Sequence, residues 1–188
     1  MRTALITGVA GFIGSHIAEA LIDQGFCVVG IDNESTGKRE NVPNTVNYFL
    51  GDVLDNPLLD SIFNDGIDVV FHLSGLASTV LSFVNPNKDI ENNVIGTLNI
   101  IKLCQKHRVS RVLYASSMTC YGHPTRIPVK ETENALPISY YGISKYTAER
   151  YLLATAMRND LNFPFNATCF RMFNVYGERQ RLDNPYQG

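Results

Sequence analysis

The chain has 188 residues, of which 45% are hydrophobic and 18% are charged, and its net charge is −2. This balance is typical of a soluble globular domain and excludes the basic surface expected of a nucleic-acid-binding protein. No apolar run is long enough to cross a bilayer, and the first one ends at Thr7-Gly8, too early for a signal peptide. The four cysteines, Cys27, Cys104, Cys120 and Cys169, do not have the spacing of metal ligands, so we expect no metal site. We expect them to be buried free thiols in a cytoplasmic protein.

Apolar runs alternate with helical patterns along the chain. The runs predict strands at residues 3–7, 27–31, 46–50, 69–73, 111–115 and 166–172. Helical spacing predicts helices at 12–24, at 86–107 and at 140–157, and a short one that Asn56-Pro57 opens. Residues 122–137 read as a loop, and residues 174–188 as the exit of the chain from the sheet. The alternation predicts a parallel sheet covered on both faces. The apolar face of the helix at 86–107 is expected to comprise Ile90, Val94, Leu98, Ile101 and Cys104.

A glycine-rich segment connects the first predicted strand to the first predicted helix. In the pattern Gly8, Gly11, Gly14, one glycine permits a turn at positive φ, one admits a pyrophosphate, and one lets the helix pack on the strand. Free N–H groups at the helix N-terminus, where Phe12 and Ile13 lie, favour an anion. Glycines also mark ordinary turns, but the strand–loop–helix context required of a dinucleotide site is met here.

Asp32 ends the second predicted strand. A carboxylate at this point accepts hydrogen bonds from the adenosine ribose hydroxyls and repels a 2′-phosphate, which favours NAD over NADP. By itself Asp32 would serve equally well as a turn residue, and the glycines shift the balance to function. Lys38 and Arg39 leave room for NADP, although a solvated loop accounts for them better.

Two further patterns carry chemistry. Tyr141 and Lys145 are four residues apart on a predicted helix and share a face. An ammonium stabilises phenolate, so Lys145 is expected to lower the pKa of Tyr141 from about 10 and to make it a general base and acid. Ser116 and Ser117 are expected just beyond the fifth strand, where α/β sheets bind ligands. Each pattern alone has an ordinary explanation, namely a surface tyrosine beside a snorkelling lysine, and serines in a turn.

A set of short motifs occurs along the chain in a fixed order: TGVAGFIG at 7–14, GDV at 51–53, HLSG at 72–75, NNV at 92–94 with GT at 96–97, ASSMTCYG at 115–122, YGISK at 141–145 and RMFNVYG at 171–177. Together they resemble the extended short-chain dehydrogenases/reductases of nucleotide-sugar metabolism, in particular the UDP-glucose 4-epimerases. The resemblance covers essentially the whole chain. It implies an α/β Rossmann fold, a doubly wound parallel sheet of strand order 3-2-1-4-5-6, and an NAD-dependent nucleotide-sugar 4-epimerase that works through a 4-keto intermediate.

The resemblance also implies roles residue by residue. Ser117, Tyr141 and Lys145 match the catalytic residues, and Lys145 would also hold the nicotinamide ribose. Thr119 and Asn174, together with Ser117, would contact the nucleotide sugar. Contacts with the cofactor are implied for Gly8, Gly11, Phe12, Ile13, Gly14, Asp32, Asn33, Asp52, Val53, Leu73, Ser74, Gly75, Asn92, Tyr141, Lys145 and Phe173.

Departures from the family pattern narrow the activity. Met118 and Thr119 follow Ser117 where similar dehydratases carry acidic residues, and neither can act in an elimination, which disfavours a dehydratase. Ala77 stands where bacterial UDP-galactose epimerases carry a lysine, so the sugar stays open. Residues 177–188 are similar to epimerases of N-acetylated UDP-hexoses and dTDP-6-deoxyhexoses. The alternatives are another enzyme of this fold (dehydratase, decarboxylase or reductase) and a non-catalytic NAD(H)-binding protein.

Members of the resembling family are longer than this chain and carry a C-terminal substrate domain. We therefore expect residues 1–188 to form a truncated NAD-binding Rossmann domain from which the substrate domain is absent. The expected partners are a UDP- or dTDP-hexose and a second copy of the chain, in a homodimer that packs through the helices at 86–107 and 140–157. Neither a nucleic acid nor a membrane is an expected partner.

Overall fold

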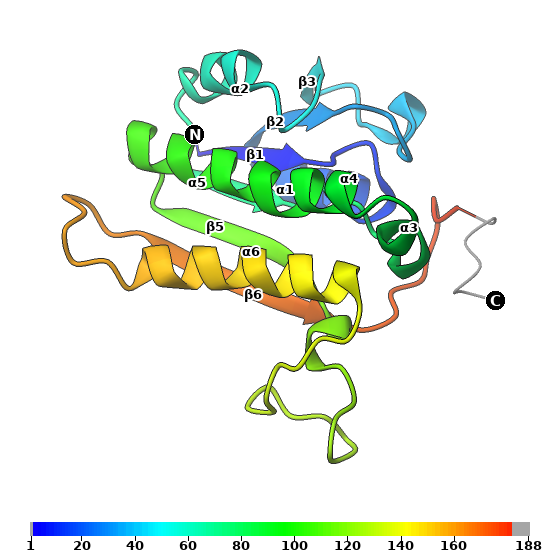
Figure 1. Ribbon diagram of the computed structural model, residues 1–188. Helices are drawn as coiled ribbons and strands as arrows, with labels where there is room; N and C mark the ends of the chain where they lie inside the picture. Colours follow the sequence, from blue (N-terminus) through cyan, green and yellow to red (C-terminus); the bar gives the residue numbers. More distant parts are fainter. Residues whose placement is uncertain (1, 182–188) are drawn as a thin grey trace.

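The computed structural model describes residues 2–181. Its centre is a parallel sheet of six strands in the order β3-β2-β1-β4-β5-β6, which confirms the predicted Rossmann order (Figure 1). The order changes direction between β1 and β4, and the crevice at such a point is where open α/β sheets bind ligands. The strands are β1 (Thr3–Thr7), β2 (Cys27–Asp32), β3 (Asn47–Leu50), β4 (Val69–His72), β5 (Arg111–Ser117) and β6 (Asn166–Met172).

Helices cover the two faces unequally. One core cluster unites the sheet with α2 (Asn56–Phe63), α5 (Gly96–His107) and α6 (Tyr140–Ala156). A smaller cluster packs α1 (Phe12–Asp23) on the other face. Figure 1 shows α5 and α6 side by side in front of the sheet, with α1 behind it. Successive residues of β1 serve the two cores, because side chains alternate across a strand: Leu5 enters the larger cluster, and Ala4 and Ile6 the smaller.

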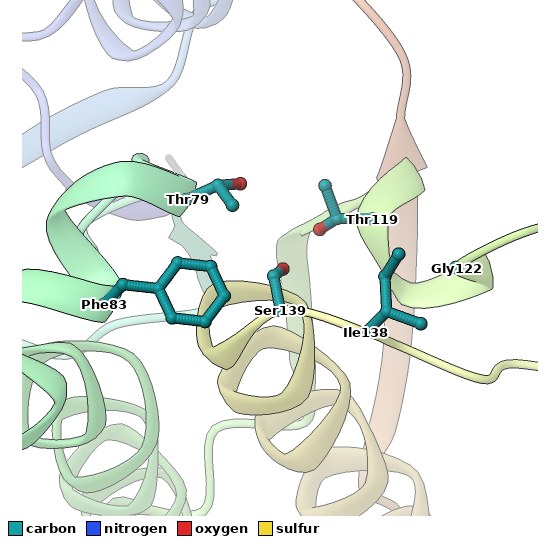
Figure 2. Close-up of a pocket in the computed structure, with 6 residues that line it drawn as sticks. All are labelled: Thr79, Phe83, Thr119, Gly122, Ile138 and Ser139. Atoms are coloured by element: carbon teal, nitrogen blue, oxygen red, sulfur yellow. The ribbon is translucent and has the colours of Figure 1, made fainter.

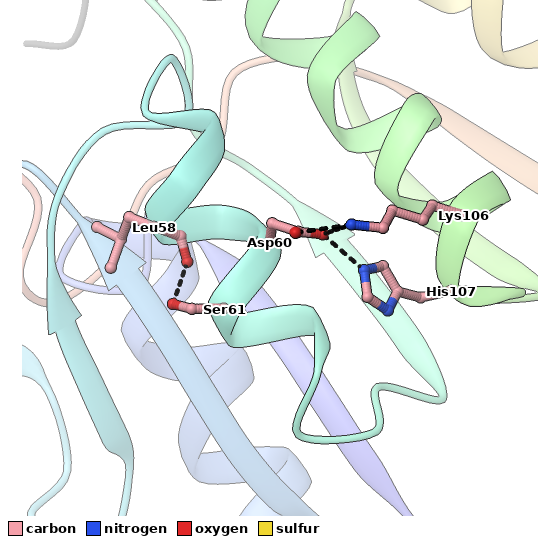
Figure 3. Close-up of polar contacts among 5 residues, drawn as sticks. All are labelled: Leu58, Asp60, Ser61, Lys106 and His107. Atoms are coloured by element: carbon pink, nitrogen blue, oxygen red, sulfur yellow. Dashed lines mark hydrogen bonds and ion pairs between the residues drawn. The ribbon is translucent and has the colours of Figure 1, made fainter.

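Polar side chains at the surface join α2 to α5. Asp55 caps α2 by accepting from the N–H of Leu58, and a proline occupies the first turn. On the same helix, Asp60 accepts from Lys106 at 2.7 Å and contacts His107 Nε2 at 2.8 Å, both at the C-terminal end of α5 (Figure 3). These two partners lower the pKa of Asp60. The cluster thus ties α2 to the last turn of α5.

The helix expected at 86–107 is divided into three parts. It begins as α4 (Pro86–Ile90), widens into a π-helical segment (Glu91–Ile95), and continues as α5. A shorter helix that the sequence did not reveal, α3 (Thr79–Val84), precedes it. The expected apolar face holds from Val94 onward, but Ile90 is 49% exposed. A π-helical segment shifts the register of the helix by one residue, which explains why the 3.6-residue pattern fails before it.

Two other expectations need correction. Ser116 and Ser117 are the last residues of β5 and do not lie beyond it, because their pairing with β6 continues to Met172. The cysteines are free, but Cys27 is exposed and Cys169 is half-buried, so only Cys104 and Cys120 are buried thiols. Cys27 is the first residue of β2, and its side chain is exposed.

After β6 the chain turns back over α1. The ring of Phe12 lies close to Gly177, His16 Nε2 is 3.1 Å from the carbonyl oxygen of Glu178, and Arg179 forms an ion pair with Glu19. The predicted exit from the sheet is therefore also a contact with the helix that follows the glycine loop. Residues 182–188 lie outside the described part. Within residues 2–181, no helix is long and apolar enough to cross a membrane.

Candidate active site

The loop between β1 and α1 has the geometry of an anion cradle. Gly8 adopts φ +75°, which favours glycine, and a Cβ on Gly14 would stand 2.1 Å from the carbonyl oxygen of Gly8. Gly11 begins α1 without a side-chain cap, so the first-turn N–H groups, which include those of Phe12 and Ile13, have no side-chain acceptor. Such N–H groups and the helix dipole attract a phosphate. The structure thus shows the positive φ at Gly8 and the close packing at Gly14 that the pattern predicts, and the approach of a pyrophosphate stays a prediction.

Asp32 stands at the end of β2, next to this loop. Its Oδ2 accepts from the N–H of Ala10 at 2.9 Å and its Oδ1 from the N–H of Glu34 at 2.8 Å. Burial raises the pKa of Asp32, and these backbone bonds oppose the rise. A carboxylate has about four acceptor positions, so two remain for the hydroxyls of a ribose. The side chain is held in place before any ligand arrives.

Beyond Asp32, three of the expected cofactor contacts lie close together. Asn33 Nδ2 donates to Asp52 Oδ2 at 2.7 Å, and Asp52 Oδ1 accepts from the N–H of Leu54. Val53 is buried, and its carbonyl oxygen accepts from Asn99 Nδ2 at 3.1 Å. The three expected residues at 33, 52 and 53 therefore lie together at the carboxyl end of β2 and β3.

The two cations that left room for NADP are both engaged. Lys38 Nζ pairs with Glu40 at 3.3 Å on the exposed surface. Arg39 donates to the carbonyl oxygen of Val42 at 3.1 Å and lies over the ring of Tyr48. With Arg39 occupied and Asp32 fixed, the loop favours a free 2′-hydroxyl over a 2′-phosphate. These residues fit NAD.

A buried network links β1 to the loop after β4. The hydroxyl of Thr97 donates to the carbonyl oxygen of Asn93 at 2.6 Å, so it accepts from His72 Nε2 at 3.0 Å. His72 Nδ1 then accepts from the hydroxyl of Thr7 at 2.8 Å. Thr7 Oγ1 accepts in turn from the backbone N–H groups at 73 and 74 and from Ser74 Oγ. This network orients the segment 73–75, which is expected to line the cofactor, and sequence reasoning did not reveal it.

Ser117, Tyr141 and Lys145 come together at the carboxyl end of β5. Ser117 Oγ accepts from both the N–H of Thr119 (3.2 Å) and its hydroxyl (2.9 Å). Its own proton is therefore directed at Tyr141, to which it is hydrogen-bonded. Lys145 is buried, with its Nζ 4.6 Å from the ring centroid of Tyr114. The grouping is that of a general acid–base pair next to a hydroxyl donor.

The protonation of this group differs from the sequence-based expectation. Burial raises the pKa of Tyr141 to about 12, although the bond from Ser117 opposes the rise. Burial also lowers the pKa of Lys145 to about 8. The prediction that Lys145 brings the pKa of Tyr141 below 10 is therefore wrong for this chain, because desolvation of the phenolate outweighs the ammonium charge. The same burial makes the charged form of Lys145 less favourable.

Ser116, one residue before Ser117, faces the opposite side of β5. Its hydroxyl donates to Glu149 Oε2 at 2.9 Å, and Glu149 is held by two bonds from Arg171 of β6. Arg171 in turn lies over the ring of Tyr121. This buried cluster joins α6 to β5 and β6, and it separates the structural serine from the one in the site.

A cavity of 390 Å³ is lined by two neighbours of this group: Thr119, whose hydroxyl donates to Ser117, and Ser139, which caps the helix of Tyr141. Figure 2 shows three hydroxyl groups and the ring of Phe83 turned towards the same space. Among the described residues no charged side chain lines it, which suits a neutral polyol with an apolar substituent or face. It is lined by Thr79, Phe83, Thr119, Gly122, Ile138 and Ser139.

A second cavity, of 250 Å³, lies between α1 and strands β4 to β6. It contains two of the expected cofactor residues, Ile13 and Leu73, and its walls are apolar. An apolar wall at this point suits the face of an aromatic cofactor ring.

The remaining expected residues lie around this group in different ways. Asn92 Nδ2 donates to the carbonyl oxygen of Lys88 within its own helix, whereas Asn93 bonds to both the N–H and the carbonyl oxygen of Leu76. Asn93, which sequence reasoning missed, is thus the asparagine that holds the loop after β4. Phe173 is exposed and 6.5 Å from the ring of Tyr121, and Asn174 is exposed beside it. Among the described residues, no group of three His, Cys, Asp or Glu could hold a metal.

Comparison with known proteins decides the family. The model of the NAD dependent epimerase/dehydratase family matches residues 4–187. The chain belongs to this family. NAD is the cofactor of the family, as Asp32 predicted, and the resemblance to nucleotide-sugar epimerases is confirmed.

Individual relatives agree. The UDP-glucose 4-epimerase of Azospirillum brasilense is 34% identical over 174 residues, which are 92% of this chain and 49% of that protein. The structure of the Thermotoga maritima UDP-glucose 4-epimerase with UDP-glucose has a TM-score of 0.90 at 36% identity and covers 96% of this chain and 58% of that one. The structure of the UDP-N-acetylglucosamine 4-epimerase of Methanobrevibacter ruminantium, in complex with UDP-N-acetylmuramic acid, has a TM-score of 0.89 at 36% identity. This match covers 98% of this chain and 59% of that one. The chain therefore spans about half to three-fifths of the length of these relatives.

Proposed function

We propose that this chain supplies the NAD-binding half of a nucleotide-sugar 4-epimerase of the UDP-glucose 4-epimerase kind. The observation that carries the proposal is the hydrogen bond between Ser117 and Tyr141, whose neighbours Thr119 and Ser139 line the cavity. A hydroxyl and a phenol suffice for oxidation and reduction at one carbon. Elimination of water needs an additional acid or base, and Thr119 takes the place in the cavity wall where a dehydratase needs one.

The chemistry of the chain's residues follows from their placement. In the proposed reaction, Ser117 holds the 4-hydroxyl oxygen of the sugar while Tyr141 removes its proton, and Lys145 lies four residues along the same helix. NAD, held by the glycine loop and Asp32, would accept a hydride from sugar C4 and give it back. Tyr141 then protonates the oxygen of the 4-keto sugar once the opposite face is presented. An uncharged cavity imposes no ionic contact that would prevent the sugar from turning.

The cavity also bears on the competing reactions. A decarboxylase acts on a sugar carboxylate, and among the described residues that line the cavity none is a cation. This favours a neutral hexose, carried on UDP or dTDP. Glucose is the first candidate sugar, and an N-acetylated sugar is the second. The second is supported by the similarity to a UDP-N-acetylglucosamine 4-epimerase and by the ring of Phe83 in the cavity wall. We infer a cytoplasmic enzyme, since free thiols suit a reducing compartment.

The proposed partner protein is a second copy of the chain. Apolar side chains are exposed in one neighbourhood, on α3, on the segment from α4 to the π-helical turn, and on α6. Phe83 of α3 and Tyr140 of α6 contact each other within it, with ring centroids 4.8 Å apart. An exposed surface of this kind marks an interface. The residues concerned are Val80, Leu81, Phe83, Val84, Ile90, Ile95, Tyr140, Ile143 and Tyr151.

The test uses the full encoded protein without added NAD. It is incubated with UDP-glucose, UDP-N-acetylglucosamine or dTDP-glucose, and the anomeric region is followed by proton NMR. We expect the 4-epimer of one of these sugars from the wild type and from Tyr140→Phe, and none from Tyr141→Phe. If no sugar is epimerised while NADH still binds, the proposal fails, and net oxidation or reduction of the sugar would point to a reductase instead.

A further inference from the structure

A carboxylate without an assigned role lies beneath the catalytic group. Asp89 belongs to α4, is 0% exposed, and accepts from Asn93 Nδ2 on its Oδ1 at 3.0 Å. Its Oδ2 is buried and has no hydrogen-bond partner among the described residues. Burial of a carboxylate in this state is costly unless an opposite charge compensates it. The structure therefore calls for a cation near Asp89.

Lys145 of α6 is the cation whose charge acts on Asp89, although the two side chains form no direct ion pair. It is buried, and the described groups that act on it come from several elements. Asp89 of α4 is the only carboxylate among them. The others are the thiols of Cys120 and Cys169, both with raised pKa, and the ring of Tyr114, which it contacts. His72 and Tyr141 complete the surroundings, and burial keeps both in their neutral forms.

The two groups are also linked through Asn93. The amide of Asn93 connects Asp89 Oδ1 with Ser144 Oγ at 3.1 Å and with both backbone groups of Leu76. A Cβ on Gly75 would stand 2.5 Å from Asn93 Oδ1 and 3.6 Å from Lys145 Nζ. The loop after β4 thus lies between Asn93 and the Lys145 ammonium at Gly75. Asp89 holds the Asn93 side-chain amide in place through its hydrogen bond.

We propose that Asp89 is the counter-ion of Lys145 and a positioning residue of the site, keeping the lysine charged while it anchors Asn93 against the loop at 75–76. The role of Asp89 in activity rests on the proposed function, whereas its effect on the charge of Lys145 does not. Its negative charge stabilises the ammonium and opposes the Tyr141 phenolate. Neutralising it lowers the pKa of both groups.

The first experiment measures the lysine directly. The full encoded protein is labelled with [ε-¹³C]lysine, the Lys145 signal is assigned by its loss in Lys145→Met, and its shift is followed against pH. The wild type is expected to titrate near 8, the value to which burial lowers its pKa. In Asp89→Asn the midpoint falls by about one pH unit, the low end of what an opposite charge contributes. Glu91→Gln removes an exposed charge two residues along and leaves the midpoint in place.

Asp89→Ser provides a second neutral variant, so the result does not depend on one substitution that fails to fold. An unchanged Lys145 midpoint in a folded neutral variant overturns the proposal. Asn93→Ser separates the two parts of it: this change loosens the loop and keeps the carboxylate, so it weakens NADH binding and leaves the Lys145 midpoint unshifted. A shift as large in Asn93→Ser as in Asp89→Asn would assign the effect to loop structure and also overturn the counter-ion role.

The second experiment measures epimerisation against pH. In Asp89→Asn both the acid and the alkaline limb of kcat move to lower pH, because Tyr141 and Lys145 each lose the influence of the carboxylate. A merely structural role would reduce kcat with both limbs in place, which contradicts the proposal. If the wild type epimerises no sugar, the proposed function fails, and the lysine titration still decides the role of Asp89.

Discussion

The carbonyl oxygen of Gly8 lies where a side chain on Gly14 would have to be, 2.1 Å from an ideal Cβ. The first turn of α1 therefore packs directly on the loop that leaves β1. This contact sets the distance between the free N–H groups of the helix and Asp32 at the end of β2. The shape of the dinucleotide site thus depends on the absence of one atom.

Gly14→Ala is expected to lower the free energy of unfolding by about 2–3 kcal/mol and to reduce NADH affinity at least tenfold, because the helix must move away from the loop. Urea denaturation and NADH fluorescence titration measure the two effects. The control is Gly25→Ala. Gly25 has φ +79° but nothing within 4 Å of an added Cβ, so that variant loses stability and keeps its affinity. Equal loss of NADH affinity in both would contradict the packing argument.

Asp32→Asn is expected to weaken NAD binding by about 10–100-fold, since charge-assisted bonds to the ribose are lost. NADP binding improves relative to NAD, because the repulsion of a 2′-phosphate disappears. Calorimetric titration with both nucleotides measures the ratio. Asp68→Asn is the control: Asp68 also accepts from a backbone N–H, that of Thr3, but at the opposite end of the sheet. An unchanged NAD/NADP ratio in Asp32→Asn would remove the residue from the site.

Ser117→Ala is expected to lower kcat about 100-fold and to move the limb of the pH profile that Tyr141 governs to higher pH. The reason is that the Ser117 hydroxyl stabilises the phenolate and holds the pKa of Tyr141 below the level that burial alone would set. Ser116→Ala serves as the matched control, because that hydroxyl is bonded to Glu149 on the other side of β5. In this variant the same limb should stay where the wild type has it.

The free energy of unfolding is expected to decrease as the pH is lowered, because of His72. Burial, and then the charge of Lys145, lower the pKa of His72 to about 3, well below its value of about 6.5 in an unfolded chain. The native state therefore disfavours the proton. The contribution of His72 is complete above pH 6.5 and declines by about 1.4 kcal/mol per pH unit as the pH falls from there towards 3. Urea denaturation of His72→Gln should show a flatter decline between pH 6.5 and 5 than the wild type or the exposed His123→Gln.

Ile143→Glu is expected to convert the proposed dimer into a monomer. The side chain is 47% exposed on α6, in the neighbourhood where the apolar residues of α3 and α4 gather, and a charge there cannot be buried between two copies. Sedimentation velocity measures the mass. Ile127→Glu alters a residue that is 89% exposed in the loop at 122–137 and should leave the dimer intact. A monomeric wild type would contradict the proposed partner.

Local patterns carried the prediction of the fold a long way. β1 and β6 begin and end where the predicted strands do. For β1 the reason is that a strand buried in a parallel sheet needs a continuous apolar segment. The glycine loop and Asp32 were also readable, since their chemistry depends on a few neighbouring residues and on one strand end. The π-helical segment was not, because its widened turn is stabilised by contacts of Asn93 with Leu76 and Asp89, which periodicity does not report.

The sequence by itself determined which residues could carry the proposed chemistry: Tyr141 and Lys145 share a helix face whatever surrounds them. Only the tertiary structure decided how those groups ionise. Burial raises the pKa of Tyr141 and lowers that of Lys145, against the expectation from their pairing alone. Desolvation depends on every element packed around a group, and so does the approach of Asp89 from another helix. Neither is encoded in the spacing of neighbouring residues.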